Sequence, residues 1–463
     1  MSPSLHDRLQ QLRRPAAGSA LESLERELLS PPALAEGEIL PLKARLQRLV
    51  AVAAQKERER RRAPAPVPLE ELVDGMRVEN ERGEFFRVDS GVHLEVRHGD
   101  VPLSRVQAIA PDTVRVLSGQ PELEGFDLRR AVFLDTETTG LAGGSGTAAF
   151  LVGLGWVEGE RFRVRQCFMR DYHEEPALLC GVAEELARFA QVVTFNGKMF
   201  DLPLLETRFR LNRERYPLAG ARHLDLLHPA RRLWKARLES CRLQALEVEL
   251  MGLRRTGDLP GEEIPQVYFD WVRRRDAGRL ARVFEHNRQD IVSLAALAVH
   301  ACRWVEEGSA EDPRDLYSLG RVLERAREFE KSETQYTRAL AAGAGAVRGP
   351  ALVRLAWRAE RSGRHQRALA LWREAAEAGE PLALRQLAIH HEHRTRDYAA
   401  ALAAVERGLA LVEGDDGSEV GRRDLRRSRL AEAFARRRKR LLRKASRSPA
   451  AGTPPGPGSA PAS

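Results

Sequence analysis

The chain has 463 residues and a mass of 51.8 kDa, which is too long for one ordinary hydrophobic core, so we expect two or three domains. Hydrophobic residues make up 43% and charged residues 30% of the chain, a balance typical of globular rather than disordered protein. No apolar run approaches the ~20 residues that a membrane span requires, and residues 1–14 lack the apolar segment of a secretory signal. We therefore expect a cytoplasmic protein with no membrane partner.

The formal net charge of +9 and the pI near 9.7 favour polyanionic partners. A GC-rich genome would also produce the excess of arginine and alanine, so charge alone leaves nucleic-acid binding open. The four cysteines are scattered without metal-ligand spacing, which predicts free thiols rather than disulfides or a zinc site: Cys167, Cys180, Cys241 and Cys302.

The first 125 residues divide into two segments. Residues 1–66 predict a charged helical segment that ends in a Pro- and Ala-rich linker. Residues 67–125 predict a small β-rich segment, because apolar and polar residues alternate at 84–88 and 92–96, and we expect this pattern to continue to about Leu117. Neither segment indicates a function.

Residues 126–305 predict an α/β domain. The apolar run 131–134 is typical of a strand buried on both faces, and further strands are expected at 148–157, 162–169 and 192–195. Helices are expected at 176–190 and 199–211, followed by a mainly helical stretch. This order predicts a mixed sheet with flanking helices.

Residues 312–412 contain an internal repeat of about 36 residues, with small residues at positions where paired helices approach closely. The spacing resembles tetratricopeptide (TPR) repeats and predicts an all-α helical-repeat domain. Residues 413–463 predict a basic helix and a disordered tail. Such a basic helix is either a solvated surface or a contact for nucleic acid.

Asp135 and Glu137 stand at the end of the predicted strand 131–134. Side chains at i and i+2 of a strand point to the same side, and two carboxylates so placed repel each other unless a cation lies between them. Taken alone, the pair predicts either a cation site or an acidic pair that caps a helix or turn after the strand.

Further acidic residues follow on other buried elements. Asp201 stands near the start of a helix, and His286 and Asp290 share one face of a later helix because they are four residues apart. Four carboxylates and a histidine are the set that two-cation hydrolysis of a phosphodiester requires.

These motifs, in this order, resemble those of the DEDD (DnaQ-like) 3′–5′ exonuclease superfamily, whose fold is ribonuclease H-like. Residues 135–140 resemble its first motif, Asn196 with Phe200 and Asp201 its second, and His286 with Asp290 its third. The glycine-rich stretch 143–147 that leads into residues 150–153 is similar to the YprB-type branch, which often carries TPR repeats behind the nuclease domain.

The resemblance implies that two divalent cations, Mg²⁺ or Mn²⁺, are held by the four carboxylates Asp135, Glu137, Asp201 and Asp290. It implies a general base at His286, although the family usually places this histidine five positions before the aspartate and here the interval is four. It also implies substrate contacts that involve Thr138, Gly140, Asn196 and Phe200. Asp225 matches a family aspartate that we interpret as structural.

Two functions remain open at this stage. One is a metal-dependent 3′–5′ exonuclease that acts on single-stranded or frayed ends of RNA or DNA. The other is a non-catalytic nucleic-acid-binding adaptor whose repeats recruit a protein partner. The stretch around Trp234, with Arg231, Arg232 and Arg237, is either a basic stacking surface or a helix with tryptophan inward and arginines outward.

Overall fold

A computed structural model describes residues 67–140, 146–343, 345–413 and 422–446 of the chain. The predicted N-terminal helical segment, the glycine-rich loop at 141–145 and the C-terminal tail beyond 446 lie outside the described residues. The chain divides into two units between Val67 and Pro68. The fold described below is that of the second unit alone.

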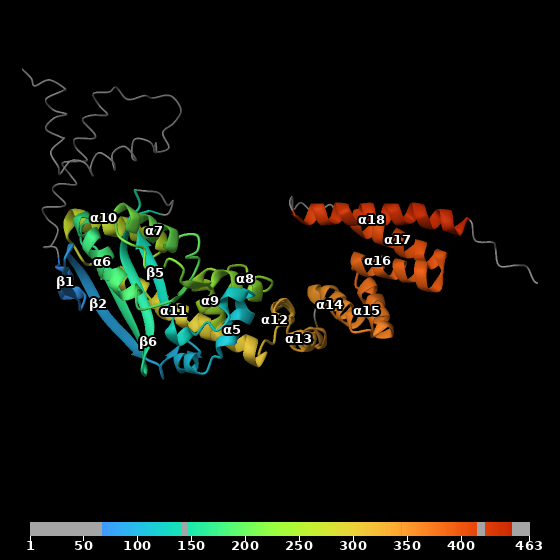
Figure 1. Ribbon diagram of the computed structural model, residues 1–463, viewed down its shortest axis with the longest axis horizontal. Helices are drawn as coiled ribbons and strands as arrows, with labels where there is room; N and C mark the ends of the chain where they lie inside the picture. Colours follow the sequence, from blue (N-terminus) through green and yellow to red (C-terminus); the bar gives the residue numbers. More distant parts are fainter. Residues whose placement is uncertain (1–66, 141–145, 344, 414–421, 447–463) are drawn as a thin grey trace, which may run out of the picture. The chain divides into compact units, whose positions relative to one another are not determined.

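A seven-stranded mixed sheet forms the centre of the α/β region (Figure 1). Its order is β1-β2-β7-β6-β5-β8-β9; β5, β8 and β9 are parallel and the other neighbours antiparallel. The strands are β1 (Met76–Asn80), β2 (Gly83–His93), β5 (Val132–Thr138), β6 (Ala149–Glu158), β7 (Arg161–Phe168), β8 (Gln191–Thr194) and β9 (Arg222–Asp225), and a separate pair joins β3 (Arg97–His98) to β4 (Val101–Pro102).

Helices cover both faces of this sheet. In the α/β region they are α4 (Leu69–Leu72), α5 (Pro111–Ser118), α6 (Glu175–Leu186), α7 (Asp201–Leu211), α8 (Leu227–Trp234), α9 (Leu243–Met251), α10 (Ile264–Arg274) and α11 (Leu280–Glu307). Successive side chains of β5 point to opposite faces. Phe133 therefore packs in one core with Ile291 of α11, whereas Leu134 packs in the other with residues of α6 and α7.

The fold class expected from the sequence is confirmed: a mixed sheet with flanking helices precedes an all-helical region, and strands occur near the start of the described chain. The expected β pattern up to Leu117 is wrong in its last part, because residues 111–118 form helix α5. Pro111 opens this helix and Gly119 ends it in the left-handed conformation, with φ 64°. The strands β1 and β2 are not separate from the next segment, since β2 pairs with β7.

The C-terminal region consists of antiparallel helix pairs. They are α12 (Pro313–Arg325) with α13 (Phe329–Ala341), α14 (Arg348–Arg361) with α15 (His365–Glu377), and α16 (Pro381–His390) with α17 (Tyr398–Glu413), followed by α18 (Arg422–Ala445). Small residues sit where the helices approach most closely. Gly320 of α12, for example, leaves no room for a Cβ beside the ring of Tyr336.

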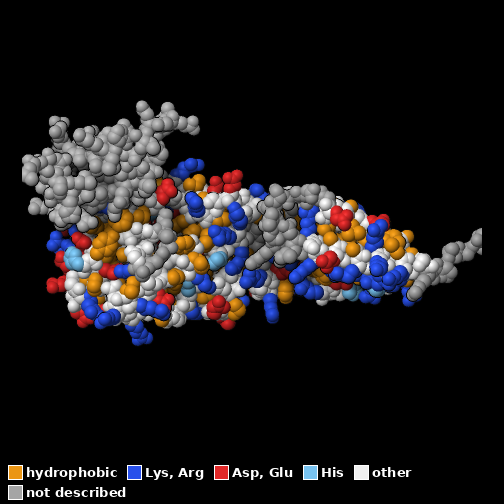
Figure 2. Space-filling model, turned by 90° about the horizontal axis from the view of Figure 1, so that it is seen from above, with side chains coloured by type: hydrophobic (Ala, Val, Ile, Leu, Met, Phe, Trp, Pro, Cys, Tyr) orange, Lys and Arg blue, Asp and Glu red, His pale blue; other side chains and the backbone are white. Residues whose placement is uncertain are grey.

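The basic helix α18 is anchored on one side by a buried acid. Glu392, in a π-helical turn after α16, accepts hydrogen bonds from Arg440 at 2.7 Å and from Lys444 at 2.9 Å, and it also pairs with Arg437. Part of the basic character of α18 is therefore structural. Figure 2 nevertheless shows many lysine and arginine side chains on the visible face of the helices toward the C-terminus.

Candidate active site

Asp135 and Glu137 lie at the end of the central strand β5, on the face covered by α11. Asp135 Oδ2 accepts a hydrogen bond of 2.9 Å from Asn287 Nδ2 of that helix. Glu137 Oε1 is buried and has no hydrogen-bond partner among the described residues. An acceptor left unsatisfied in the interior is costly, so this oxygen marks a position where a cation or donor is expected.

Asp201 is the first residue of α7, as the sequence predicted near a helix start. Its Oδ1 accepts hydrogen bonds from the backbone nitrogen of Thr136, at 3.1 Å, and from the Thr136 hydroxyl, at 2.6 Å. The strand residue between the two acids of β5 therefore fixes the third acid beside them.

Asp290 and His286 project from α11 toward β5. The Nε2 atom of His286 is 4.0 Å from Glu137 Oε1 and 3.8 Å from Asp290 Oδ2. The interval of four residues thus places the histidine and the aspartate together. Asp290 also pairs with the buried guanidinium of Arg255.

Asp258 orients the histidine. The Nδ1 atom of His286 lies 2.7 Å from Asp258 Oδ1, and because an ionised carboxylate only accepts, Nδ1 carries the proton. The Nε2 atom then faces the acidic residues. Burial raises the pKa of Asp258, but the hydrogen bond and charge of His286 and the charge of Arg255 hold that pKa below its usual value.

The four acids share one electrostatic environment. Burial raises the pKa of Asp135 well above its usual range, and the charges of Asp290, Glu137 and Asp201 raise it further. Burial, then the charges of Asp290 and Asp201, likewise raise the pKa of Glu137. Burial raises the pKa of Asp201 to about 6 and also raises that of Asp290, against the lowering effect of Arg255. In the absence of a cation, the four carboxylates therefore bind protons more tightly than solvated acids do.

The donor chemistry of this cluster fits divalent cations, which prefer carboxylate oxygens. Within the described ranges, however, no group of three or more acidic, histidine or cysteine side chains is already arranged so that it could hold a metal ion. The unsatisfied Glu137 oxygen and the mutual repulsion of the four acids, of which Glu137 and Asp201 are buried, are the features that a bound cation would relieve.

The residues expected to contact substrate lie around the same strand end. The Thr138 hydroxyl donates to the carbonyl oxygen of Gly140 at 2.9 Å. Asn196 adopts a left-handed backbone with φ 66°, and Phe200 is 55% exposed although it immediately precedes the buried Asp201. Asp225 accepts from the backbone nitrogens of Asn196 at 2.8 Å and Lys198 at 3.1 Å, so it holds the backbone that precedes Phe200.

The sequence interpretation missed several polar residues that contact the acids or His286 directly. Arg255 bonds Glu247 at 2.7 Å and Asp258 at 3.1 Å in addition to Asp290. Asn287 bonds Asp135, as described above. The sequence carried a signal for Asn287, because this residue directly follows the predicted site residue His286 in the third motif. Arg255 and Asp258, by contrast, belong to none of the three motifs.

The interpretation of the Trp234 stretch as an inward tryptophan with outward arginines is confirmed for two of its residues. Trp234 is fully buried and Arg231 is exposed. Arg237 instead forms an ion pair of 2.5 Å with Asp315 of α12.

The predicted free thiols are also confirmed, since all four cysteines are unpaired. No helix in the described part of the chain has the length and apolar character of a membrane span.

The mixed sheet, with an acidic strand end facing α11, defines a ribonuclease H-like domain. In agreement, a model of the RNase H superfamily matches residues 132–302. Over 350 residues the chain is 30% identical to the uncharacterized protein YprB of Bacillus subtilis (strain 168), with 74% of this chain and 84% of YprB covered. The chain therefore belongs to the YprB family of RNase H-like proteins, a superfamily that points to nuclease-type chemistry on nucleic acid.

Proposed function

We propose that this protein is a metal-dependent 3′–5′ exonuclease of the DEDD type that acts on single-stranded or frayed ends of RNA or DNA. The observation that carries the proposal is the cluster of four acids with raised pKa values, two of them buried and two half-buried, beside a histidine whose Nε2 faces them. Buried acids in such a repulsive arrangement are characteristic of functional sites.

Two divalent cations, Mg²⁺ or Mn²⁺, are assigned to the four carboxylates of Asp135, Glu137, Asp201 and Asp290. When bound, such cations neutralise charge on the attacking and leaving oxygens of the phosphodiester. Asn287 and Thr136 hold Asp135 and Asp201 in place through the hydrogen bonds described above.

His286 acts as the general base in this proposal. Its Nε2 is directed at the acidic cluster and accepts the proton of the attacking water, while Asp258 holds Nδ1 and stabilises the imidazolium that forms. This arrangement supports the base role despite the unusual interval of four residues to Asp290.

Thr138 and Gly140, with Asn196 and Phe200, are assigned to the terminal nucleotide. The support for Phe200 is its exposure beside Asp201, because an exposed ring next to catalytic acids offers a stacking surface for a base. The paired helices α12–α17 are assigned to a TPR-like module, which is also a possible site for a protein partner.

The test is degradation of 5′-labelled single- and double-stranded RNA and DNA in Mg²⁺, Mn²⁺ or a chelator. We expect a ladder of products shortened from the 3′ end in the presence of cation and no products with chelator. The double variant Asp135→Asn/Glu137→Gln should be inactive, whereas Glu262→Gln, on an exposed residue, should behave as wild type. Equal degradation by the double variant and wild type would reject the assignment of nuclease activity to these carboxylates, and no degradation by wild type would favour the adaptor function.

A further inference from the structure

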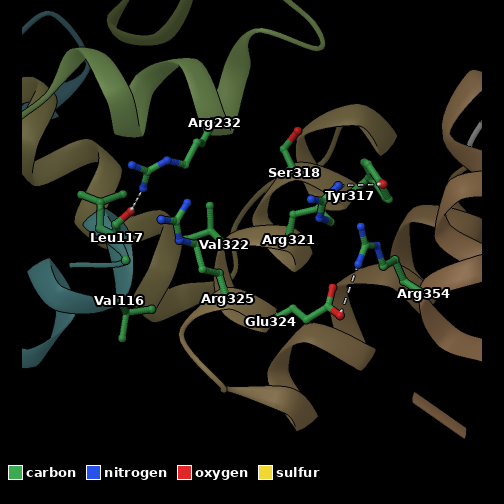
Figure 3. Close-up of a pocket in the computed structure, with 11 residues that line it drawn as sticks. Val116, Leu117, Arg232, Tyr317, Ser318, Arg321, Val322, Glu324, Arg325 and Arg354 are labelled. Atoms are coloured by element: carbon green, nitrogen blue, oxygen red, sulfur yellow. Dashed lines mark hydrogen bonds and ion pairs between the residues drawn. The ribbon is translucent and has the colours of Figure 1, made fainter. Parts of the chain in front are cut away.

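A basic cleft of about 550 Å³ lies where α5 and α8 of the α/β region meet α12 and α14 of the helical region (Figure 3). Its lining includes four arginines and a single acid. The charged residues are Arg232, Arg321, Arg325, Arg354 and Glu324. The charged side chains that line the cleft therefore carry a net positive charge.

Arg232 and Arg325 approach each other from α8 and α12 (Figure 3). Arg232 donates to the backbone carbonyl of Ser118 at the end of α5, which fixes its position without neutralising its charge. Burial, and then the positive charge of Arg325, lower the pKa of Arg232. Neither guanidinium forms an ion pair with a described carboxylate, so two cations face the cleft together with no anion between them.

The other side of the cleft is also short of negative charge. Glu324 accepts a hydrogen bond of 2.7 Å from Tyr336 and lies 3.6 Å from both Arg354 and Arg361, so two arginines share one carboxylate. Arg321 is exposed and donates to the Tyr317 hydroxyl at 3.3 Å. Tyr317 itself is a half-buried ring on the cleft wall.

We propose that this arginine-lined cleft binds the phosphate backbone of a single-stranded nucleic acid whose 3′ end lies in the active site. Guanidinium groups suit phosphate oxygens because of their planar, multidentate geometry. A basic groove with an aromatic wall is the combination that holds single strands without reading their sequence. This inference rests on the proposed function for its substrate class.

Helix α11 relates the cleft to the active site. Asp290 lies in its first half, and Glu306, near its end, accepts hydrogen bonds from the backbone nitrogen of Ala110 at 2.9 Å and the hydroxyl of Thr113 at 2.5 Å in the α5 segment. At 1.5 Å per residue, Asp290 and Glu306 are roughly 24 Å apart along the helix. At the roughly 3.4 Å rise of a stacked strand this distance corresponds to roughly seven nucleotides, and an extended single strand covers it with fewer. A dinucleotide is too short to occupy both sites.

Binding in a chelator tests the cleft independently of catalysis. The probe is a fluorescent single-stranded 20-mer of oligouridylate or oligothymidylate, and the full chain carries Arg321→Glu/Arg325→Glu or the milder Arg321→Gln/Arg325→Gln. We expect about tenfold weaker binding at low salt for the double glutamate variant and a shallower salt dependence for both variants. Arg367→Glu, on an exposed residue of α15, is the matched charge-reversal control and should bind as wild type.

Activity on substrates of two lengths provides the second measurement. With Mg²⁺, both cleft variants should lose kcat/KM on the 20-mer by about tenfold and retain wild-type activity on a dinucleotide, which reaches only the active site. Unchanged binding and unchanged salt dependence in the cleft variants would overturn the cleft proposal. If unlabelled polyglutamate displaces the 20-mer as well as unlabelled oligonucleotide does, the assignment to nucleic acid is also overturned.

The two proposals fail in different ways. If wild-type protein degrades no substrate, yet the 20-mer binds in chelator and the cleft variants weaken it, the nuclease assignment fails while the cleft stands. If wild type degrades both lengths, and the cleft variants match it on both, the cleft fails while the nuclease assignment stands.

Discussion

The Nδ1 atom of His286 lies 2.7 Å from Oδ1 of Asp258, and this contact turns Nε2 toward Glu137 and Asp290. The two residues are 28 positions apart in the chain: Asp258 lies on irregular chain between α9 and α10, and His286 lies in α11. A carboxylate behind an imidazole fixes its tautomer and its direction. Asp258 is thus a positioning residue, which acts through His286 and not on the substrate.

The first prediction follows from that contact. In Asp258→Asn the carboxamide cannot stabilise an imidazolium, so kcat should fall by about tenfold to a hundredfold and the acidic limb of the pH–rate profile should shift. Affinity for Mn²⁺, measured by calorimetry, should stay near wild type, because Asp258 is not assigned to a cation. A wild-type pH profile in this variant would leave Asp258 with only a structural role; Glu262→Gln, on an exposed nearby residue, is the control.

The sequence alone predicted the sheet class and most of the acids because both depend on local patterns. An apolar run followed by Asp135 and Glu137 predicts a buried strand with an acidic end. The same reasoning could not find Arg255 or Asp258, since they lie on irregular chain between α9 and α10, and only tertiary packing brings them to α11. It also misjudged residues 111–117, where apolar spacing suits a strand or a helix and Pro111 and Gly119 favour the helix.

The second prediction concerns the counter-charge to the acids. The Arg255 side chain is only 6% exposed and contacts Glu247, Asp258 and Asp290. Arg255→Met leaves buried carboxylates without their cation, so the free energy of unfolding should fall by about 3 kcal/mol. Urea unfolding monitored by circular dichroism measures this. The adjacent Arg254 is exposed, and Arg254→Met should change stability little.

The third prediction is a dependence of stability on pH in metal-free protein. The pKa of Asp201 is about 6 in the folded protein, above its ordinary value, and the pKa values of Asp135 and Glu137 are also raised. The folded state thus binds these protons more tightly than the unfolded chain does, and their contribution to stability is lost as the pH rises through about 6. In EDTA, the melting temperature should therefore fall between pH 5.5 and pH 7.5.

Divalent cation and a carboxamide variant provide the controls for that measurement. At pH 7.5, Mn²⁺ should raise the melting temperature by about 4 °C or more, because a ligand that binds only the folded state stabilises it. Asp201→Asn should show a smaller loss of stability between pH 5.5 and pH 7.5 than wild type. An identical pH dependence in wild type and variant would contradict the assignment of the effect to this cluster.

The fourth prediction tests the packing behind Asp135. Gly153 of β6 pairs with Asp135 in the sheet register, and a Cβ added there would overlap the side chain of the buried Asn287. That side chain is held by Gln166, at 2.9 Å, and by Asp135, so it has no alternative position. Gly153→Ala should therefore lower stability by about 2 kcal/mol and activity by more than stability alone explains. Gly261→Ala, where a Cβ meets open space, should do neither.

The fifth prediction separates substrate stacking from structure at Phe200. Phe200 and Leu211 mark the two ends of α7 and are both 55% exposed, so truncation of either should leave the melting temperature near wild type. Only Phe200 is beside the acids. Loss of base stacking is expected to raise KM by about tenfold in Phe200→Ala, with partial recovery in Phe200→Trp and no change in Leu211→Ala. A rise in KM of equal size in Leu211→Ala would show that the effect belongs to the exposed apolar surface of α7 and not to a nucleotide pocket at Phe200.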